Sequence, residues 1–298
     1  MLPPRARELE SALAKAGYLA DSETVLALFL ALELDRPLLL EGPAGVGKTE
    51  LARSAATALG RELVRLQCYE GLDEAKALYE WDYAKQMLYT QLLRETAQRT
   101  VAGAESIADA ADRLAGSEDA FFSERFLVAR PLLQALRADA PVVLLVDEVD
   151  RAEPEFEALL LEVLAEKQIT IPELGTIRAK HSPLVILTTN ATRDMTDALR
   201  RRCLHSALDY PTPSRELAIV TARVPGIAKD LAAELVGFAQ KVRTMDLRKP
   251  PSIAETIDWA RSMLNMGAST LDKELRDATL GVLLKYQEDR EKAAALPG

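Results

Sequence analysis

Residues 42–49 read Gly42-Pro43-Ala44-Gly45-Val46-Gly47-Lys48-Thr49 and match G-x-x-x-x-G-K-[ST], the pattern of a phosphate-binding loop. An apolar run at residues 37–40 leads into the loop with the character of a buried strand, and residues 50–56 leave it with the character of a helix. Glycines let the backbone N–H groups of such a loop close around phosphate oxygens. The amino-terminus of the following helix adds a partial positive charge. The sequence therefore predicts a nucleotide site.

Two side chains of this loop have the chemistry to contact a nucleotide directly. Lys48 can reach the β- and γ-phosphates of ATP, and the Thr49 hydroxyl can ligate Mg²⁺. The expected cofactors are therefore ATP and Mg²⁺. The candidate nucleotide-binding residues are Gly42, Pro43, Ala44, Gly45, Val46, Gly47, Lys48, Thr49, Glu50 and Asp147, and the candidate metal ligands are Thr49 and Asp147.

A second motif, residues 142–148, reads Val142-Val143-Leu144-Leu145-Val146-Asp147-Glu148. A buried strand that ends in two carboxylates would place both of them at the carboxyl edge of a parallel sheet, beside the loop. Asp147 is suited to hold Mg²⁺ through water, and Glu148 to polarise the water that attacks the γ-phosphate. A strand followed by an acidic helix cap is the alternative. The presence of the loop upstream favours the catalytic interpretation.

A third strand-like run, residues 185–189, ends at Asn190. An asparagine at a strand end can orient the attacking water together with Glu148, although asparagine is also an ordinary turn residue. Its place after the first two motifs favours a catalytic role.

Three consecutive arginines, Arg200, Arg201 and Arg202, close the next helical stretch. Three consecutive residues cannot all lie on one helix face, which disfavours a single buried role for the run. One interpretation is a solvated helix end favoured by the helix dipole. The other is an arginine finger that neutralises transition-state charge on a neighbouring subunit's nucleotide. We favour the finger, with Arg202 ahead of Arg201, and the predicted catalytic residues are Glu148, Asn190, Arg202 and Arg201.

Composition narrows the class of protein. The 298 residues are 48% hydrophobic, which suits one large domain or a core with a smaller domain. The net charge of −9 disfavours a surface built generally for nucleic acid or anionic membrane. Cys68 and Cys203, taken with the two histidines, have no metal-ligand spacing, and two isolated thiols suit a reducing cytoplasm. We expect no signal peptide, because charged residues interrupt the first ten positions, and no membrane insertion, because the longest apolar run, residues 25–32, is short.

The order of the predicted elements divides the chain in two. Helical periodicity opens the chain, and strand-like runs then alternate with helices, which predicts a parallel sheet flanked by helices. The strand signal ends near residues 210–213, where two prolines break the chain. We expect an α/β nucleotide-binding core over residues 1–211 and a small all-helical lid domain over residues 212–298. The expected helices are 5–16 and 22–34 in the core and 215–223, 230–242, 252–266 and 271–286 in the lid, and the expected strands are 37–40, 63–67, 142–146, 185–189 and 204–208.

These motifs, in this order, resemble those of the AAA+ ATPases, and in detail the CoxD-like branch of the MoxR family within the helix-2-insert clade. The resemblance rests on residues 42–49, 142–148, 188–190 and 200–202. Three further stretches are similar to family features: residues 67–83 to the opening of the helix-2 insert (expected at about 68–119), residues 160–171 to the helix that enters the pre-sensor hairpin (about 168–180), and residues 213–216 to the start of the lid.

The resemblance implies a P-loop AAA+ core that hydrolyses ATP to ADP and phosphate. It implies a homo-hexameric ring with nucleotide at the subunit interfaces. It also implies a chaperone that matures or activates a metalloenzyme together with a partner carrying a von Willebrand factor A domain. For the CoxD-like branch, the client is expected to be a molybdenum hydroxylase of the carbon monoxide dehydrogenase type.

One stretch departs from the family pattern. Many relatives open a lid helix with Ser-Pro-Arg, whose arginine contacts the nucleotide. Here the corresponding stretch reads Pro250-Pro251-Ser252-Ile253-Ala254-Glu255, without an arginine. Arg248 and Lys249, just upstream, are the candidate substitutes.

Aromatic residues gather in the expected insert, at Tyr69, Tyr79, Trp81, Tyr83 and Tyr89. The spacing of Tyr79 and Tyr83 fits one helix face. Both packing of the insert on the core and contact with a client or partner remain open from the sequence.

Two other functions also remain open. A nucleic-acid-associated motor, like the McrB-type GTPases of the same clade, would use the same core, but the acidic balance disfavours it. A small-molecule P-loop kinase would use the loop, but it needs neither Asn190 nor the arginine run and helical lid. Release of phosphate without an acceptor separates an ATPase from such a kinase.

Overall fold

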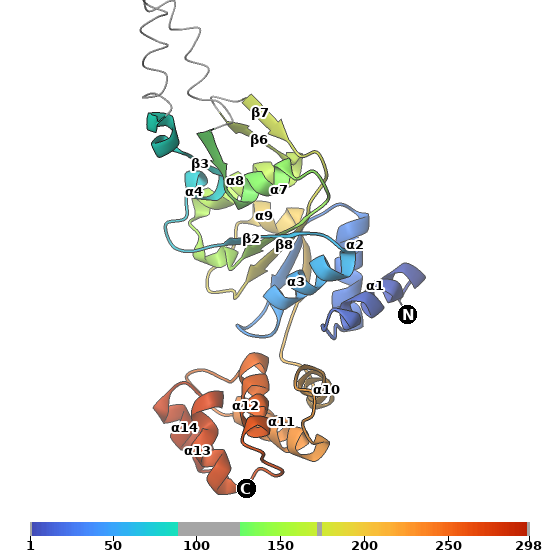
Figure 1. Cartoon of the computed structure of the whole chain (residues 1–298), viewed down its shortest axis with the longest axis vertical. Helices are drawn as coiled ribbons and strands as arrows, with labels where there is room; N and C mark the ends of the chain where they lie inside the picture. The colour runs from blue at the N-terminus through green and yellow to red at the C-terminus, as the bar shows by residue number, and fades with distance from the viewer. Residues whose placement is uncertain (1, 89–125, 172–174, 297–298) are drawn as a thin grey trace, which may run out of the picture.

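A five-stranded parallel sheet carries the predicted loop and the motifs that follow it (Figure 1). The computed structural model describes residues 2–88, 126–171 and 175–296. The strand order is β2-β5-β8-β1-β9, and every neighbouring pair is parallel. β5 and β8 are buried along their whole length, which explains why their sequences are continuous apolar runs. The strands are β1 (Leu38–Glu41), β2 (Leu63–Gln67), β5 (Val143–Asp147), β8 (Leu184–Thr189) and β9 (Leu204–Ala207).

Helices cover both faces of the sheet, as the predicted α/β fold class requires. Alternate residues of one strand serve two separate cores: Leu38 and Leu40 pack on one face with α1, α2 and α3, and Leu39 packs on the other with α7, α8 and α9. The helices are α1 (Pro4–Lys15), α2 (Ser22–Glu33), α3 (Lys48–Leu59), α7 (Pro131–Arg137), α8 (Pro154–Glu166) and α9 (Asp197–Arg202). Since all five strands are parallel, the residues that follow β1, β5 and β8 leave the sheet at the same edge.

Two separate two-stranded sheets accompany the five-stranded sheet. β3 (Tyr79–Trp81) follows the short helix α4 (Glu74–Leu78) and pairs with β4 (Leu127–Ala129), and β6 (Gln168–Ile171) pairs with β7 (Gly175–Arg178). Placing Tyr79 and Tyr83 on one helix face was therefore wrong, because Tyr79 lies in a strand. Its ring instead meets Trp81 edge-on, with centroids 5.9 Å apart. Tyr89 and residues 98–119 of the expected insert lie outside the described residues.

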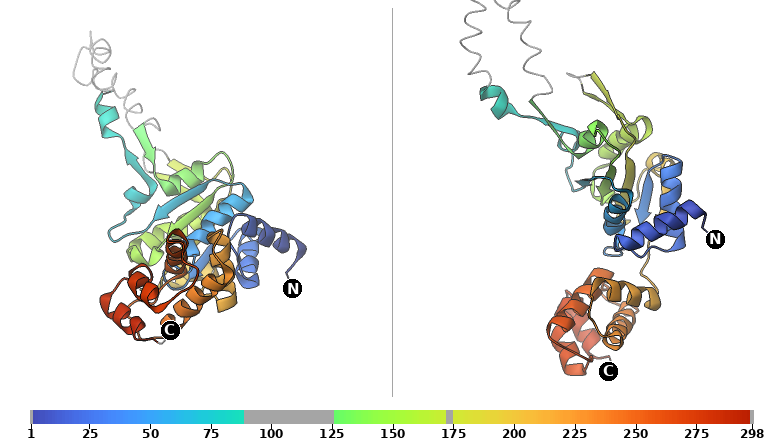
Figure 2. Two further views of the ribbon diagram at one scale, coloured as in Figure 1. Left: turned by 60° about the horizontal axis from the view of Figure 1, so that its bottom comes forward. Right: turned by 45° about the vertical axis from the view of Figure 1, so that its right-hand side comes forward.

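The carboxyl-terminal part of the chain is a separate helical cluster joined to the core after β9 (Figures 1 and 2). Through residue 296 it contains α10 (Pro213–Arg223), α11 (Lys229–Arg243), α12 (Ile253–Asn265), α13 (Lys273–Leu283) and α14 (Gln287–Ala294). The single helix expected at residues 271–286 was wrong at its end, because Leu284 adopts an extended backbone and α14 begins three residues later. None of the helices in the described ranges combines the length and apolar character that crossing a lipid bilayer requires.

A buried ion pair stands at the centre of this lid. Arg243 donates to both carboxylate oxygens of Glu216, and the two side chains are 6% and 0% exposed. Gln240 and Thr256 complete the hydrogen bonding of the pair. The charges are therefore well satisfied, and the pair ties α10 to α11 and α12.

Candidate active site

The loop between β1 and α3 has the backbone of a phosphate cradle. Gly45 and Gly47 adopt φ values of 77° and 103°, in the left-handed region that glycine reaches without strain. Gly47 caps α3 without a side-chain hydrogen bond, so no side chain in the described part of the chain accepts from the first N–H groups of the helix. A side chain at Gly45 would place its Cβ 2.3 Å from the Cβ of Ser252, so glycine here also lets the lid approach the loop.

Lys48 joins the loop to the end of β8. Its Nζ atom donates to the carbonyls of Gly42 and Pro43, at 2.6 and 2.8 Å, and to the side-chain oxygen of Asn190 at 2.8 Å. Burial lowers the pKa of the Lys48 ammonium, although the nearby carboxylates, Asp150 first among them, oppose that shift. The structure thus brings Asn190 to the phosphate loop through Lys48, a contact that was not predicted from the sequence.

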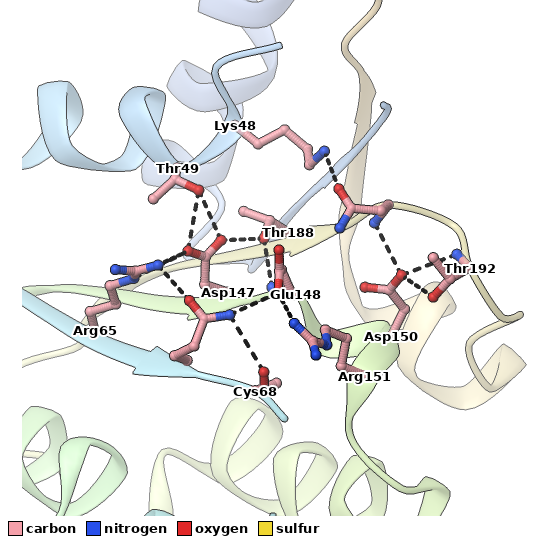
Figure 3. A network of polar contacts seen from close by, with 12 residues as sticks. Lys48, Thr49, Arg65, Cys68, Asp147, Glu148, Asp150, Arg151, Thr188 and Thr192 are labelled. Carbon is pink, nitrogen blue, oxygen red and sulfur yellow. Dashed lines mark hydrogen bonds and ion pairs between the residues drawn. The ribbon is translucent and has the colours of Figure 1, made fainter. Parts of the chain in front are cut away.

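The two carboxylates that end β5 lie beside the loop (Figure 3). Thr49 Oγ1 donates to Asp147, 3.0 and 3.2 Å from its two oxygens. Thr188 links both acidic residues: its hydroxyl donates to Asp147 Oδ1 at 2.6 Å and accepts from the Glu148 N–H at 2.8 Å. Thr188 is fully buried. The predicted Thr49, Asp147 and Glu148 therefore share one network, in which Thr188 ties the Asp147 carboxylate to the backbone of Glu148.

Three further polar residues belong to this network and were missed from the sequence. Arg65 donates to Asp147 Oδ2 from Nε at 3.1 Å and from Nη2 at 2.6 Å. Gln67 Nε2 and Arg151 Nη1 both reach Glu148 Oε2, at 3.0 and 3.1 Å (Figure 3). Arg65 and Gln67 alternate with buried residues on β2, and β2 pairs in register with β5. This alternation at the end of a strand could have indicated that Arg65 and Gln67 face the site. It identifies them only when the strand order places β2 beside β5.

Asp150 holds the segment that follows β8. One of its carboxylate oxygens accepts from the N–H of Asn190 at 3.2 Å and from the N–H and hydroxyl of Thr192 at 3.0 and 2.6 Å. Burial by itself would raise the pKa of this carboxyl, but these hydrogen bonds overcome it and lower the pKa. Asp150 therefore stays ionised and keeps Asn190 in place.

Of the three arginines in the run, Arg200 reaches the end of β1 next to the loop, whereas Arg201 and Arg202 lie away from this edge of the sheet. Arg36, which precedes β1, donates to the carbonyls of Arg201 and Arg202 at 2.8 and 3.2 Å, whereas the loop follows β1, four residues and about 13 Å further on. Arg200 pairs with Glu41 at 3.3 Å. Arg201 and Arg202 are exposed, and among the described residues their guanidinium groups have no ion-pair or hydrogen-bond partner. The structure does not bring these two arginines to the phosphate loop of their own chain.

A pocket beside the loop lies between core and lid. It is lined by Gly17, Tyr18 and Leu19 from the turn after α1, by residues 45–47 and Glu50, by residues 208, 209 and 211, and by Arg215, Ile219, Arg223, Ile253, Ala254 and Ile257 of the lid. Burial raises the pKa of Tyr18 to about 12. The wall of this pocket is largely apolar and lies next to the phosphate loop, so the pocket suits the base and sugar of a nucleotide.

The predicted substitutes for the missing lid arginine are engaged elsewhere. Arg248 stacks over the Tyr286 ring, 4.1 Å from its centroid, and Lys249 lies 3.7 Å from Glu255. Two other lid arginines reach the core beside the pocket. Arg223 pairs with the predicted Glu50 at 3.0 Å, and Arg215 pairs with Asp21 at 2.5 Å.

Known proteins share this combination of sequence features. Residues 37–203, from the start of β1 through α9, match the AAA domain of the dynein-related subfamily. NorQ of Paracoccus denitrificans is 26% identical over 295 residues, which cover 94% of each chain. YojN of Bacillus subtilis, an uncharacterized protein, is 26% identical over 307 residues, or 98% of this chain and 86% of its own.

Other similarities are more partial. The chaperone protein ClpB 2 of Parasynechococcus marenigrum is 31% identical over 149 residues, which cover 50% of this chain and 13% of ClpB 2. Among solved structures, the RuvB Holliday junction branch migration motor of Thermotoga maritima aligns with 93% of this chain and 69% of its own, at a TM-score of 0.46 and 17% identity. The family match spans more than half of the sequence and contains each motif of the site, and the chain belongs to the dynein-related subfamily of AAA domains, as an AAA+ ATPase of the MoxR type.

Proposed function

We propose that this AAA+ ATPase is a remodelling chaperone that works as a homo-hexameric ring and completes each active site with an arginine from the neighbouring subunit. The observation that carries the proposal is the division of the site residues. Lys48, Asp147, Glu148 and Asn190 meet at one edge of the sheet, whereas Arg201 and Arg202 are held near the opposite edge by Arg36.

The residues at the edge fit ATP with Mg²⁺. The glycine loop and the uncapped start of α3 suit phosphate oxygens. The Thr49 hydroxyl and the Asp147 carboxylate, 3.0 Å apart, are oxygen donors of the kind Mg²⁺ prefers, directly or through water. The described residues contain no cluster of three or more metal-ligating side chains, which fits an ion held largely by phosphate and water. The bound ion would neutralise charge on the phosphates.

Glu148 is the residue that polarises the attacking water. Gln67 and Arg151 both bind Glu148 Oε2, which fixes the direction of the carboxylate. Asn190, held by Lys48 and Asp150, is placed to orient the same water. Both roles act on a water molecule as the phosphoryl acceptor, which favours hydrolysis over transfer to a small-molecule acceptor.

The cellular role rests on the relatives. The chain aligns along 94% of its length with NorQ, and half of it resembles a chaperone protein, ClpB 2. We propose that it acts in the cytoplasm, with a von Willebrand factor A-domain partner, to mature or activate a metalloenzyme such as a molybdenum hydroxylase of the carbon monoxide dehydrogenase type. The two free cysteines are both buried, as suits a reducing compartment.

Two active-site variants test the chemistry. Lys48→Ala should abolish ATP binding, because the loop loses its cation. Glu148→Gln should bind ATP and stop hydrolysis, because only water activation is lost. Phosphate release is measured without an acceptor and nucleotide affinity with a fluorescent ATP analogue. A Glu148→Gln protein that hydrolyses ATP at the wild-type rate would refute the assignment.

The same variants test the cellular role. Tagged Glu148→Gln protein, locked with ATP, should retain partners in its native host that Lys48→Ala protein does not retain. The proposal expects a metalloenzyme subunit and a von Willebrand factor A-domain protein among them. Retention of DNA at low salt by purified rings, with neither protein enriched, would favour the nucleic-acid motor instead.

A further inference from the structure

A short connector, residues 190–196, joins the active-site residue at the end of β8 to α9, the helix that carries the arginine run. It begins at Asn190, whose side chain contacts Lys48 of the same subunit. It ends at Thr196, the amino-terminal cap of α9, the helix that carries Arg201 and Arg202. Four of its seven residues are exposed and only Met195 is buried, so packing of its own side chains anchors the connector at a single position. The buried carboxylates of Asp150 and Glu157 accept hydrogen bonds from the connector and hold it on the core.

The first carboxylate, Asp150, holds the Asn190 end. All three of its hydrogen bonds to the connector go to Asn190 and Thr192, at 2.6 to 3.2 Å. The residue is only 4% exposed. Asp150 comes directly after Val149 in the turn that follows Glu148, so it ties Asn190 to the strand end that carries the catalytic carboxylate.

The second carboxylate, Glu157 of α8, holds the α9 end. Glu157 is fully buried, and its Oε1 accepts from Arg193 Nη1 at 2.6 Å while its Oε2 accepts from the N–H of Thr196 at 2.8 Å. Arg193 also donates to the carbonyl of Ala152 at 2.6 Å. A buried charge with these partners is expensive to disturb, because loss of one leaves the other without compensation.

The rest of α9 has few other attachments. Leu199 is buried against the core of α7 and α8, and Arg36 covers the last carbonyls of the helix. With only six residues, α9 cannot hold its own position by helix stability. Its orientation therefore depends on these contacts, on the ion pair of Arg200 with Glu41, and on the amino-terminal contact that Glu157 supplies.

We propose that Glu157 is a positioning residue for the arginine that α9 presents to the neighbouring subunit, and that Asp150 is the matching positioning residue for Asn190 in the subunit's own site. This inference rests on the proposed trans-acting arginine. Catalytic geometry is sensitive to such support, since a displacement of about 1 Å can cost on the order of 100-fold in rate.

Mixed rings test the two roles separately. Acceptor subunits carry Arg201→Ala and Arg202→Ala, so they keep an intact site but offer no arginine. Donor subunits carry Glu148→Gln, so they offer arginines but cannot hydrolyse ATP. With donors in excess, phosphate release reports hydrolysis in acceptor sites completed by donor arginines.

Glu157→Gln added to the donor should lower this rate at least about tenfold, and the same change added to the acceptor should have a much smaller effect. Asp150→Asn should show the reverse pattern. Arg193→Met, which removes the side-chain donor to Glu157 Oε1, is a second donor variant that tests the same carboxylate if Glu157→Gln assembles poorly. The control is Glu162→Gln, an exposed carboxylate on the same helix as Glu157, which should change nothing in either subunit. Sedimentation confirms that each mixture forms rings.

The outcomes distinguish the inference from the function on which it rests. If verified mixed rings without further changes show no hydrolysis, the trans-acting arginine fails. If they are active but Glu157→Gln and Arg193→Met donors keep the full rate, the positioning role fails alone. Equal losses from donor and acceptor would show a general structural role for Glu157 and would also overturn it.

Discussion

Thr188→Val should separate the positioning of the two catalytic carboxylates from the binding of nucleotide. Valine has nearly the shape of threonine, so the buried site keeps its volume and loses only the hydroxyl. That hydroxyl donates to Asp147 and accepts from the Glu148 N–H, at 2.6 and 2.8 Å. The substitution therefore removes the link between the Asp147 carboxylate and the backbone that carries the Glu148 carboxylate.

The size of the effect follows from the two bonds. A hydrogen bond to a charged group contributes about 1.5–3 kcal/mol, and a buried donor left without an acceptor costs about 1–3 kcal/mol. Asp147 still accepts from Thr49 and Arg65, so the loss of its hydrogen bond to Thr188 should cost about 1.5 kcal/mol, the lower end of the first range. Together, the lost hydrogen bond to Asp147 and the unpaired N–H of Glu148 should lower the free energy of unfolding by about 3 kcal/mol. That loss corresponds to a fall of roughly 6–12 °C in the unfolding midpoint.

The effect on turnover should be larger than the effect on binding. With the carboxylates less well placed, we expect kcat to fall by about tenfold to 100-fold. ATP affinity should change little, because the contacts of Lys48 are untouched. The assays are phosphate release, titration with a fluorescent ATP analogue, and thermal unfolding.

Thr188→Ser is the matched control, because it keeps the hydroxyl and loses only a methyl group. It should retain most of the wild-type turnover. The reasoning is refuted if Thr188→Val turns over ATP at the wild-type rate, or if Thr188→Ser is impaired as severely as Thr188→Val.

Three further predictions concern stability. Burial raises the pKa of Cys68 and Cys203 to about 12 from the ordinary value of 9.0. Between these pH values the folded chain holds protons that the unfolded chain has released, so the free energy of unfolding should fall as pH rises from about 9 toward 12. Urea unfolding at pH 8 and pH 10 measures the difference. Glu216→Gln weakens the buried pair with Arg243 and should lower the free energy of unfolding by on the order of 3 kcal/mol; an unchanged midpoint in calorimetry would contradict this. The buried Ser206 hydroxyl has no hydrogen-bond partner among the described residues, so Ser206→Ala should leave stability unchanged to within about 0.5 kcal/mol or raise it, as denaturant titration would show.

Local chemistry explains why the motifs could be found without a structure. The loop at residues 42–49 depends on glycine conformations and on one lysine, and these requirements are written in consecutive residues. β5 and β8 are apolar throughout because both faces of the sheet are covered, so their ends at Asp147 and Thr189 stood out in the sequence. Parallel pairing then places their polar ends at one edge.

Errors arose where long-range contacts override local periodicity. Tyr79 has helical spacing to Tyr83, but pairing of β3 with β4, nearly fifty residues away, makes it a strand residue. In the lid, the helical pattern continues past Leu283, but the backbone breaks at Leu284, whose side chain is buried in the lid core. Neither pairing nor burial against another element is visible in a short window of sequence.

The amino-acid sequence by itself determined the fold class, the nucleotide loop and the residues Lys48, Thr49, Asp147, Glu148 and Asn190, because each depends on neighbours in the chain or on the parallel order of strands. Only the tertiary structure decided which other side chains act with them. Arg65 and Gln67 enter the site because β2 lies beside β5, and Glu157 reaches the arginine-bearing helix because α8 packs against α9. Hydrogen bonds and ion pairs act over a few ångströms in space, and the residues that make them here are separated by tens of positions in sequence, so no local pattern specifies them.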